Sequence, residues 1–404
     1  MDFRRIFKKF NLLAFIAVSI FCTFYFESKN TRLEGSFSSP VLDSIYVNDA
    51  PLKFNLIPNA NPSAHSSSLV DLGDKLMLLY FAGSKEGARD VKIYQSLYSN
   101  GKWSNPRSVL DTKMLSKFSG KYIKKLGNPI IFKDAKNRFN IFIVGVSFGG
   151  WSASRIYQFT LNNDLNLEYI RELHLGPFMN LSHLVRANAL NLSDGGYILP
   201  LYHEMIKKYP LLLYFDSENR FKYAKRINKK NFLLQPSVIS INENECLAAF
   251  RTYKNNNDFF IQNCKNLGLT WGEPKKSNLK NYDSSSILLK FKNEILLLHN
   301  DGFSNPFLDN SPQNSSRRTL SLFYLKDMEN AIFDRLLTIQ IAPLEASYPS
   351  FVISKGKLHL SYTLDRTQIK HVEIDLKIIE KLISLSKENK LSNITFHDLN
   401  KFRD

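Results

Sequence analysis

Acidic side chains in this sequence are spaced in a way that could support proton transfer. Two carboxylates, Glu86 and Asp90, lie in residues 82–90, the longest break between the first apolar runs of the folded region, beside Gly83 and Gly87. A carboxyl group that is held near a reacting atom can give or take its proton. Whether these two can act therefore depends on the elements that position the loop.

Arginine side chains further along the chain are candidates for binding an anion. These are Arg251, Arg317 (or its neighbour Arg318) and Arg366. A guanidinium group matches a carboxylate with two parallel hydrogen bonds, which a lysine cannot do. Surface arginines are the plain alternative. A metal site or another cofactor is not indicated, because the histidines are scattered and neither HExxH nor an Asp-rich calcium spacing occurs.

The carboxylate loop belongs to a series of short strands that reverse on one another. Gly73-Asp74 and Ser99-Asn100-Gly101 separate β-rich runs that are too short for helices, which is the pattern of hairpins. We expect strands over residues 65–72, 75–81 and 91–98 and the start of a fourth at 102–103. A four-stranded meander with acids in one loop is the predicted repeating unit.

A hairpin turn followed by an apolar strand recurs along the chain, near residues 76, 139, 197, 246, 295 and 358. A spacing of roughly 50–65 residues is in the range of repeat and propeller architectures. Six such units extend from residue 64 to 375, and residues 44–46 or 54–56 could supply the strand that closes the ring. Two stacked β-sandwiches are the alternative architecture.

Composition and charge favour an all-β globular protein with a basic surface. The chain has 404 residues, of which 31 are Phe and 18 are Tyr, and its formal net charge is +17. Aromatic residues are common in strands. The charge indicates either a solubilising surface or attraction to anionic glycans or lipid headgroups. Nucleic acid is not an expected partner, because no basic stripe is interleaved with aromatic residues.

Two of the three cysteines flank an expected hairpin. Cys246 and Cys264 come nearly opposite each other if the chain turns at Asn255-Asn256. Opposite Cα atoms in neighbouring strands lie about 4.5–5.5 Å apart, within reach of a disulfide. A disulfide and two buried free thiols are both open. No CxxC metal pattern is present.

The ends of the chain have patterns of their own. Residues 1–9 carry four positive charges, and residues 10–26 carry none. We expect a cytoplasmic basic segment followed by a transmembrane signal anchor at residues 10–26, a tether at 27–50 and an exported propeller at 51–375. A cleaved signal peptide is the alternative. In residues 376–404 the apolar spacing predicts a short helix over residues 376–387 and then a tail.

Several segments together resemble bacterial sialidase (neuraminidase)-like proteins built on BNR, or Asp-box, repeats. Residues 264–271, CKNLGLTW, resemble the box Ser-x-Asp-x-Gly-x-Thr-Trp with Cys for Ser and Asn for Asp, and residues 100–103, NGKW, form a shortened version. More specific segments are HSSSLV…FAGSKEGARDVKIY, GNPIIF, GGWSASRIY, GPFMNLSHLVRANAL, GGYILPLYHE, LQPSV, YDSSSILL, ASYPSF and SYTLDRTQIKHV, which together cover residues 65–372.

The resemblance implies a six-bladed β-propeller with its site at the mouth of the central channel. Polar residues near the starts of the first strands would face that mouth, namely His65, Asn128, His183, Gln235, Asp283 and Tyr348. The loops after the second strands would overhang it with Glu86, Asp90, Arg155, Tyr202, His203, Glu204, Arg251, Arg317 and Arg366.

The resemblance also implies roles for these residues in cleaving a sugar. Sialidases use an Asp as general acid/base, a Tyr nucleophile assisted by a Glu, and arginines that bind the sugar carboxylate. A neutral tyrosine suits an anomeric centre beside a carboxylate, where an anionic nucleophile would be repelled. By position, Tyr348 would be the nucleophile, Asp90 the general acid with Glu86 as competitor, and Glu204 the base.

Each of these roles has a structural alternative. Tyr348 could be a buried core residue, Asp90 or Glu86 could brace their loop, and Glu204 could pair with a lysine. His65 and His183 could bind substrate or lie in the core. The chain also lacks the Arg-Ile-Pro of such sialidases, and His65 takes roughly its place.

The function expected is therefore that of a membrane-anchored exo-glycosidase, sialidase-like, that hydrolyses a terminal α-linked acidic sugar of a glycan. A non-catalytic glycan-binding propeller is one alternative. A polysaccharide lyase that uses Tyr and His is another.

Overall fold

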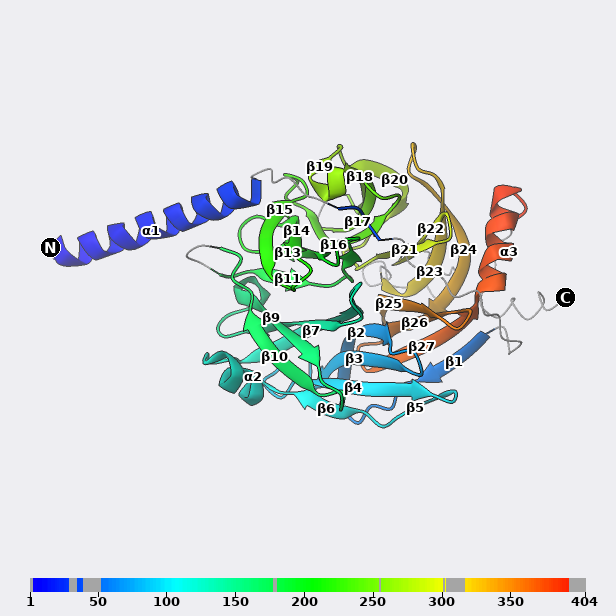
Figure 1. The fold of residues 1–404 in the computed structure, drawn as a ribbon, viewed down its shortest axis with the longest axis horizontal. Coiled ribbons are helices and arrows are strands. Elements are labelled where there is room, and N and C mark those ends of the chain that lie inside the picture. The colour runs from blue at the N-terminus through cyan, green and yellow to red at the C-terminus, as the bar shows by residue number, and fades with distance from the viewer. Residues whose placement is uncertain are drawn as a thin grey trace.

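The fold is a closed ring of six antiparallel sheets around a central channel (Figure 1). The computed structural model describes residues 3–28, 35–38, 52–176, 180–253, 256–300, 302 and 317–391. Consecutive strands pair within each sheet, and the first strand of each sheet lies nearest the channel. The predicted six-bladed β-propeller is confirmed.

The blades follow one another in chain order. The first contains β2 (Ser63–Asp71), β3 (Leu76–Gly83), β4 (Lys92–Ser99), β5 (Lys102–Trp103) and β6 (Arg107–Leu110), and the second contains β7 (Lys125–Lys133), β8 (Phe139–Val146), β9 (Ser154–Leu161) and β10 (Leu167–Glu172). The third contains β11 (His183–Val185), β12 (Leu190–Asn191), β13 (Tyr197–His203), β14 (Tyr209–Phe215) and β15 (Phe221–Arg226). The fourth contains β16 (Leu233–Ser240), β17 (Cys246–Thr252), β18 (Asp258–Lys265), β19 (Thr270–Trp271) and β20 (Lys275–Lys280). The fifth contains β21 (Ile287–Phe291), β22 (Glu294–Asn300), β23 (Thr319–Asp327) and β24 (Ile332–Ile341), and the sixth contains β25 (Ala346–Ser354), β26 (Lys357–Leu364) and β27 (Gln368–Asp375).

A strand from the N-terminal side closes the ring. β1 (Leu52–Leu56) pairs antiparallel with β27, so that Leu52 lies opposite Ile374. Residues 54–56 therefore supply the closing strand, as the sequence indicated, whereas residues 44–46 lie outside the described residues. Closure ties the last blade to the start of the propeller and leaves fewer unpaired strand edges.

The core consists of apolar layers between neighbouring blades. All residues of β3 are buried, and its side chains Met77, Leu79 and Phe81 pack with Ile141 and Phe159 of the second blade. Burying a side chain of this size contributes about 1.5–3 kcal/mol. Because every blade buries both faces in this way, the ring holds its loops at fixed places around the channel.

The first strands carry irregularities where they begin at the channel mouth. Pairing registers shift between His65 and Ser68 in β2, between Leu234 and Ser237 in β16, and between Ser347 and Ser350 in β25. Left-handed backbone recurs at the same level of the ring, with φ from 44° to 72° at Ser66, Ser182, Gln235, Asp283 and Tyr348. Bulges of this kind re-aim side chains, which here places polar groups at the mouth.

Serine hydroxyls link neighbouring first strands below these bulges. Ser350 accepts a hydrogen bond from the Leu69 amide at 3.0 Å, and Ser68 accepts one from the Ile131 amide at 3.0 Å. Ser237 does the same for the Leu288 amide at 2.9 Å. Buried amides need partners, so these serines explain the Ser-rich starts of the first strands.

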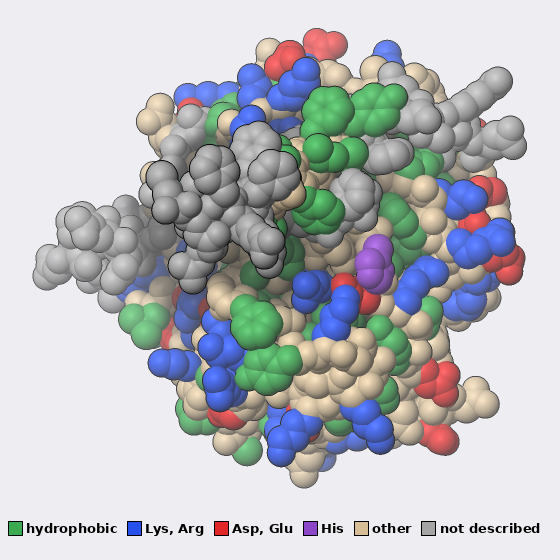
Figure 2. All heavy atoms as spheres, turned by 90° about the vertical axis from the view of Figure 1, so that its left-hand side faces the viewer, with side chains coloured by type: hydrophobic (Ala, Val, Ile, Leu, Met, Phe, Trp, Pro, Cys, Tyr) green, Lys and Arg blue, Asp and Glu red, His purple; other side chains and the backbone are tan. Residues whose placement is uncertain are grey.

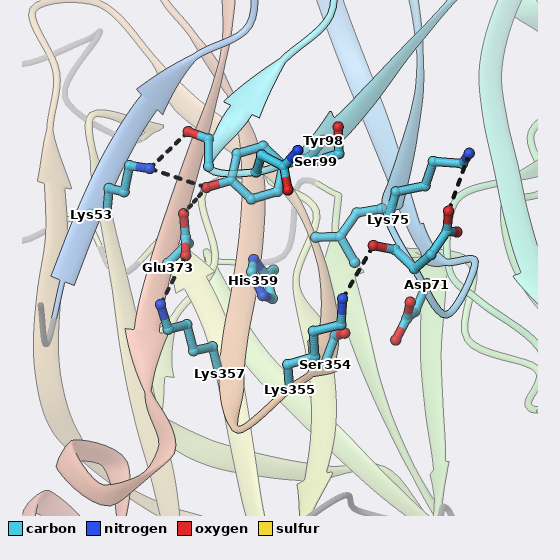
Figure 3. A pocket seen from close by; sticks show the side chains of 14 residues that line it. Lys53, Asp71, Lys75, Tyr98, Ser99, Ser354, Lys355, Lys357, His359 and Glu373 are labelled. Carbon is cyan, nitrogen blue, oxygen red and sulfur yellow. Dashed lines mark hydrogen bonds and ion pairs between the residues drawn. The ribbon is translucent and has the colours of Figure 1, made fainter. Parts of the chain in front are cut away.

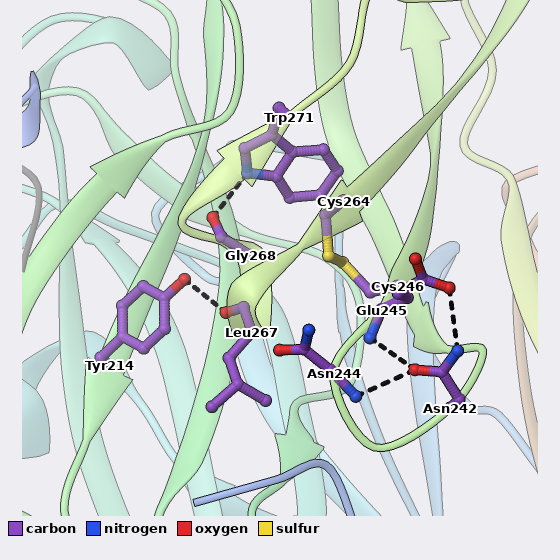
Figure 4. The surroundings of a disulfide bond; sticks show 9 residues. All are labelled: Tyr214, Asn242, Asn244, Glu245, Cys246, Cys264, Leu267, Gly268 and Trp271. Carbon is purple, nitrogen blue, oxygen red and sulfur yellow. Dashed lines mark hydrogen bonds between the residues drawn. A yellow bond between two sulfur atoms is a disulfide. The ribbon is translucent and has the colours of Figure 1, made fainter. Parts of the chain in front are cut away.

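The degenerate Asp box and the disulfide lie together in the fourth blade (Figure 4). Cys246 and Cys264 are opposite each other and joined, with Cα atoms 4.9 Å apart, so the disulfide alternative holds. The Trp271 indole donates to the Gly268 carbonyl at 2.6 Å. A Cβ at Gly268 would meet Leu212 at 2.7 Å, and its φ is +84°, which explains the glycine. The box shapes a turn and carries no chemistry.

In the described part of the chain, three α-helices flank the propeller. α3 (Leu376–Lys387) begins at Asp375, whose carboxylate accepts from the Lys377 amide, and buries Ile379 and Leu382, as its spacing predicted. α2 (Thr112–Ser119) joins the first two blades and was not predicted. α1 (Phe3–Ser28) projects from the propeller near β15 (Figure 1).

The predicted transmembrane anchor over residues 10–26 is not supported by this structure. Among the described residues, no helix is both long enough and apolar enough to cross a membrane.

Basic side chains are dispersed over the side of the molecule in Figure 2. Lys and Arg side chains lie there among apolar and neutral ones and form no continuous stripe on that side. On this side of the propeller, the positive charges are therefore not gathered into one patch.

Candidate functional site

The channel mouth brings together a tyrosine, an arginine and an aspartate from three blades. Arg251, at the end of β17, donates through Nη1 to the Tyr348 hydroxyl at 3.1 Å and through Nε to Asp283 Oδ1 at 2.6 Å. Tyr348 is 8% exposed. Burial would lower the pKa of Arg251, but its contacts with Tyr348 and Asp283 raise it. Arg251 therefore stays charged beside the phenol.

A second ionic chain continues from this group across the mouth. Arg317 donates to the Asp283 carbonyl and lies 3.5 Å from Glu345. Arg366 donates through Nε to Glu345 at 2.6 Å and through Nη1 to Glu86 at 2.6 Å. The chain thus links the fourth, fifth, sixth and first blades. We call Tyr348, Arg251, Asp283, Arg317, Glu345, Arg366 and Glu86 the mouth cluster.

Glu345 holds two of these arginines and was not identified from the sequence. It is 7% exposed and also accepts from the Ser347 hydroxyl. Burial alone would raise the pKa of its carboxyl, but His65, the Ser347 hydroxyl and Arg366 lower it below its ordinary value. A signal for it was present in the sequence, because Glu345 directly precedes the first strand of a blade. The repeat places the starts of the first strands at the channel mouth.

His65 packs against the nucleophile candidate as a neutral ring. Its ring centroid lies 4.3 Å from that of Tyr348 and 5.5 Å from that of Phe81. It is 1% exposed, and burial lowers its pKa to about 3. His65 therefore carries no charge at neutral pH. Although it takes roughly the place of the missing Arg-Ile-Pro arginine, it cannot bind an anion as an arginine would.

Tyr202 lies between two further predicted site residues. Gln235 donates to the Tyr202 hydroxyl at 3.1 Å. Burial raises the pKa of Tyr202, and the charges of Glu204 and Tyr348 raise it further. Glu204 and Tyr348 therefore both lie near Tyr202. Tyr202 was predicted as part of the same loop but without a role.

Other predicted residues make their contacts elsewhere. Asp90 accepts from both the amide and the hydroxyl of Ser84, at 2.8 Å each, and so braces its own loop. Arg155 donates to Asn180 and Ser147 and lies 3.5 Å from Glu172. These contacts do not involve the mouth cluster, in contrast to those of Glu86.

Two more predicted residues lie in the second and third blades. Asn128 donates to the Val185 carbonyl at 3.1 Å. His183 is buried, with its ring 5.4 Å from that of His203. Of the adjacent pair Arg317 and Arg318, only Arg317 joins the mouth cluster, because Arg318 donates to the Ala342 carbonyl at 3.0 Å.

A different polar cluster lies on the first and sixth blades (Figure 3). A cavity of about 430 Å³ between the first and sixth blades is lined by the turns after β2 and β25 and by Lys53, Tyr98, His359 and Glu373. Behind it, Tyr98 donates to Glu373, and His359 Nδ1 lies 3.1 Å from His371 Nε2. We call Tyr98, Trp103, His359, His371 and Glu373 the far cluster.

His359, His371 and Glu373 are close enough together to be considered as metal ligands. The Trp103 indole can only donate, and it donates to His371 Nδ1 at 3.1 Å. His371 must then carry its proton on Nε2 and donate it to His359. A metal would need both facing nitrogens without protons, so this arrangement fits a hydrogen-bond relay rather than a metal site.

Comparisons with known proteins agree with this architecture. The family model of the BNR repeat-like domain matches residues 74–360. A search of curated proteins gave no match.

Solved structures share the fold at low identity. A protein of unknown function from Dyadobacter fermentans has a TM-score of 0.62 and 11% identity, and the alignment covers 80% of this chain and 99% of that one. The NanB sialidase of Streptococcus pneumoniae has a TM-score of 0.59 and 12% identity, covering 86% and 72%. The Trypanosoma rangeli sialidase has a TM-score of 0.58 and 12% identity, covering 81% of this chain and only 57% of its own.

Proposed function

Since the chain belongs to the BNR repeat-like domain family, whose fold it shares with solved sialidases, we propose that it is a sialidase-like exo-glycosidase. It hydrolyses a terminal α-linked sugar of a glycan. The observation that carries this proposal is the contact between Arg251 and the Tyr348 hydroxyl, inside a cluster of arginines built from distant parts of the chain. Solved Trypanosoma rangeli sialidase binds sialic acid.

Tyr348 is the proposed nucleophile. Arg251 donates to the phenol oxygen, so the phenol's own proton is left for transfer to a base. Glu204, near Tyr202, is that base. Arg251, Arg317 and Arg366 provide the positive field in which a negative charge on the phenol oxygen or on a sugar is stabilised.

Asp90 is the proposed general acid. It lies in the same loop as Glu86, which contacts Arg366, so the loop borders the mouth cluster. The hydrogen bonds from Ser84 lower the pKa of Asp90, which keeps it ionised in this state. To act as an acid, Asp90 has to leave Ser84, take up a proton and then donate that proton to the leaving oxygen of a bound glycan. Hydrogen bonds at such sites often form only with substrate present.

Release of a fluorescent group from synthetic α-glycosides tests this function. The assay uses 4-methylumbelliferyl α-glycosides of N-acetylneuraminic acid and of neutral sugars. We expect hydrolysis of at least one, and Tyr348→Phe lowers kcat about 1,000-fold or more. Tyr94→Phe is the matched control, because the Tyr94 hydroxyl contacts Asn61 away from the mouth cluster. Equal turnover by wild type and Tyr348→Phe would falsify the assignment.

A non-catalytic glycan-binding propeller is the second candidate, favoured by one observation. Arg251, Arg317 and Arg366 are already paired with Asp283, Glu345 and Glu86, and Asp90 is tied to Ser84. Binding of glycans on an array without release of a monosaccharide selects this candidate.

We also propose that the propeller works outside the reducing cytoplasm. The Cys246–Cys264 disulfide supports export, because disulfides persist in oxidising compartments. The basic residues 1–9 followed by uncharged residues 10–26 have the order of an export signal. Alkaline phosphatase, which is active only after export, is fused after residue 51. Activity that is lost when residues 1–26 are deleted supports export. Retention at the membrane by residues 10–26 stays a prediction.

A further inference from the structure

Arg186 lies directly beneath the nucleophile candidate, on the channel side. It follows β11 in the third blade, and its guanidinium carbon is 5.0 Å from the centroid of the Tyr348 ring. Nη2 donates to the Pro349 carbonyl at 2.6 Å. Arg186 is thus fixed against the residue that follows Tyr348 while its charge faces the phenol ring.

The charge of Arg186 has no carboxylate partner within the described part of the chain. The side chain is 2% exposed, and its Nε has no hydrogen-bond partner among those residues. Burial lowers the pKa of Arg186 to about 10, and the groups that oppose this shift are Tyr348 and Tyr202. An arginine with that pKa is still charged at neutral pH. A buried charge without a partner is unfavourable by several kcal/mol, so the arrangement needs an explanation.

The other arginines at the mouth show how unusual this is. Arg251 pairs with Asp283, and Arg317 and Arg366 pair with Glu345. Only Arg186 of this group lies under the ring face rather than at the edge of the mouth. His65, which also packs against Tyr348, is neutral. The phenol oxygen of Tyr348 is therefore a neighbouring group that could carry a compensating negative charge.

We propose that Arg186 is the electrostatic partner of Tyr348 and stabilises the phenolate that forms when Tyr348 attacks the sugar. This rests on the proposed glycosidase function. In that step the phenol proton passes to Glu204, and the phenol oxygen forms a bond to the anomeric carbon. The bond from that carbon to the leaving oxygen breaks, and Asp90 gives its proton to that oxygen. Arg186 touches no substrate in this scheme and acts through Tyr348.

A second explanation of the charge is an anion in the channel. Arg186 also lines a cavity of about 410 Å³ at the other end of the channel, together with Leu69, Phe132, Val238, Leu288 and Phe351. That lining is mostly apolar, although Lys133, Lys290 and Asp71 also belong to it. Among the described residues, the hydrogen bond of Arg186 goes back toward the Tyr348 segment. The geometry favours Tyr348 over a bound anion, which becomes an outcome of the test.

The test compares Arg186→Met, which removes the charge at similar length, with Arg186→Lys, which keeps it. We expect Arg186→Met to lower kcat about 100-fold with little change in KM. Arg186→Lys should recover part of the loss. Circular dichroism and denaturation check that both variants fold.

A spectroscopic readout separates this inference from the proposed function. Ionisation of Tyr348 is followed in the full chain as the ultraviolet phenolate signal that Tyr348→Phe removes. We expect the midpoint in Arg186→Met to lie about one pH unit higher than in wild type, because a cation over the ring favours the phenolate. The groups that face the phenol and are unchanged between the two proteins are Arg251, Arg366, His65, Tyr202 and, through Tyr202, Glu204.

The outcomes then fall into distinct classes. A shifted midpoint supports the inference even if no glycoside is hydrolysed, in which case only the proposed function fails. An unshifted midpoint overturns it. Binding of phosphate or butyrate that Arg186→Met abolishes, with the midpoint unchanged, assigns Arg186 to the channel cavity and likewise overturns it.

Discussion

The mouth cluster and the far cluster solve the burial of polar groups differently. In the far cluster, residues on β4, β5, β26 and β27 form a relay from Trp103 through His371 to His359, and Glu373 accepts from Tyr98, Asn55 and Lys357. In the mouth cluster, left-handed backbone at Tyr348, Asp283 and Arg366 accompanies ion pairs between arginines and carboxylates and a phenol that accepts from Arg251.

The two clusters also differ in the charge of their side chains. The far cluster keeps its histidines neutral, since burial lowers the pKa of His359 to about 4 and that of His371 well below its ordinary value. The mouth cluster keeps its arginines charged and includes Arg186, which has no carboxylate partner among the described residues. A network whose polar groups all have partners stabilises a fold, whereas strained backbone and unbalanced charge are typical of sites that act on a ligand.

Removing the carboxylate of Glu345 should have the largest effect on stability. Glu345→Ala leaves Arg317 and Arg366 without their shared partner, and breaking such a buried pair costs about 3–5 kcal/mol. Urea denaturation measures the free energy of unfolding. The control is Glu168→Ala, at an exposed position on β10. An unfolding free energy equal to that of the control would show that Arg317 and Arg366 do not need Glu345 as a partner for the fold to be stable.

Acid should weaken the fold through the far cluster. Because the folded-state pKa of His359 lies near 4, below the unfolded value of about 6.5, the unfolded chain binds more protons between these pH values. Stability is therefore full above about pH 6.5 and falls as the pH drops toward 4, by about 1.4 kcal/mol per pH unit for this histidine. His359→Gln should reduce that slope in denaturation curves taken across this window. His174→Gln is the exposed control, and an unchanged slope would contradict the expectation.

The fold could be predicted from the sequence because its signals are local and repeated. Turn residues between apolar runs marked the strands, and the recurring spacing marked the blades. The helix over residues 376–387 has the predicted bounds. α2 was missed because it lies in a polar stretch and its only start signal is Asp111. The Asp111 carboxylate caps the helix by accepting from the Met114 amide.

The site could be predicted only as far as strand order places residues at the mouth. That reasoning brought Tyr348, Arg251 and Asp283 together correctly in space. It could not assign partners, since an ion pair such as that of Arg366 with Glu86 joins residues 280 positions apart and depends on side-chain reach. Arg186 was missed because its neighbours in sequence are ordinary strand residues. What distinguishes it is a buried guanidinium without a carboxylate partner among the described residues, which the sequence does not reveal.

The same substitution at Tyr98 and Tyr348 should separate the two clusters. Tyr98→Phe removes a buried donor to Glu373 and should lower the unfolding free energy by about 1–3 kcal/mol, with hydrolysis unchanged. Tyr348→Phe should change stability by less than about 1 kcal/mol, because the Tyr348 oxygen accepts only from Arg251, which keeps Asp283. Denaturation and glycoside assays on both variants measure this. Loss of hydrolysis in Tyr98→Phe would show that the far cluster also serves the reaction.

Asp283 should control whether the mouth accepts an acidic or a neutral sugar, with the smallest effect of those considered. Its carboxylate lies 2.6 Å from Arg251 and 4.0 Å from Arg317, so it occupies the position between two arginines that a sugar carboxylate would need. Asp283→Asn keeps an oxygen for Arg251 but removes the competing charge. We expect binding of free N-acetylneuraminic acid to strengthen about tenfold, or about 1.4 kcal/mol, and binding of N-acetylglucosamine to stay the same. Calorimetry on the variant, with Asp164→Asn in an exposed turn as control, measures the difference. Equal affinities in wild type and Asp283→Asn would mean that the arginines of the mouth cluster serve the fold and are not open to a substrate anion.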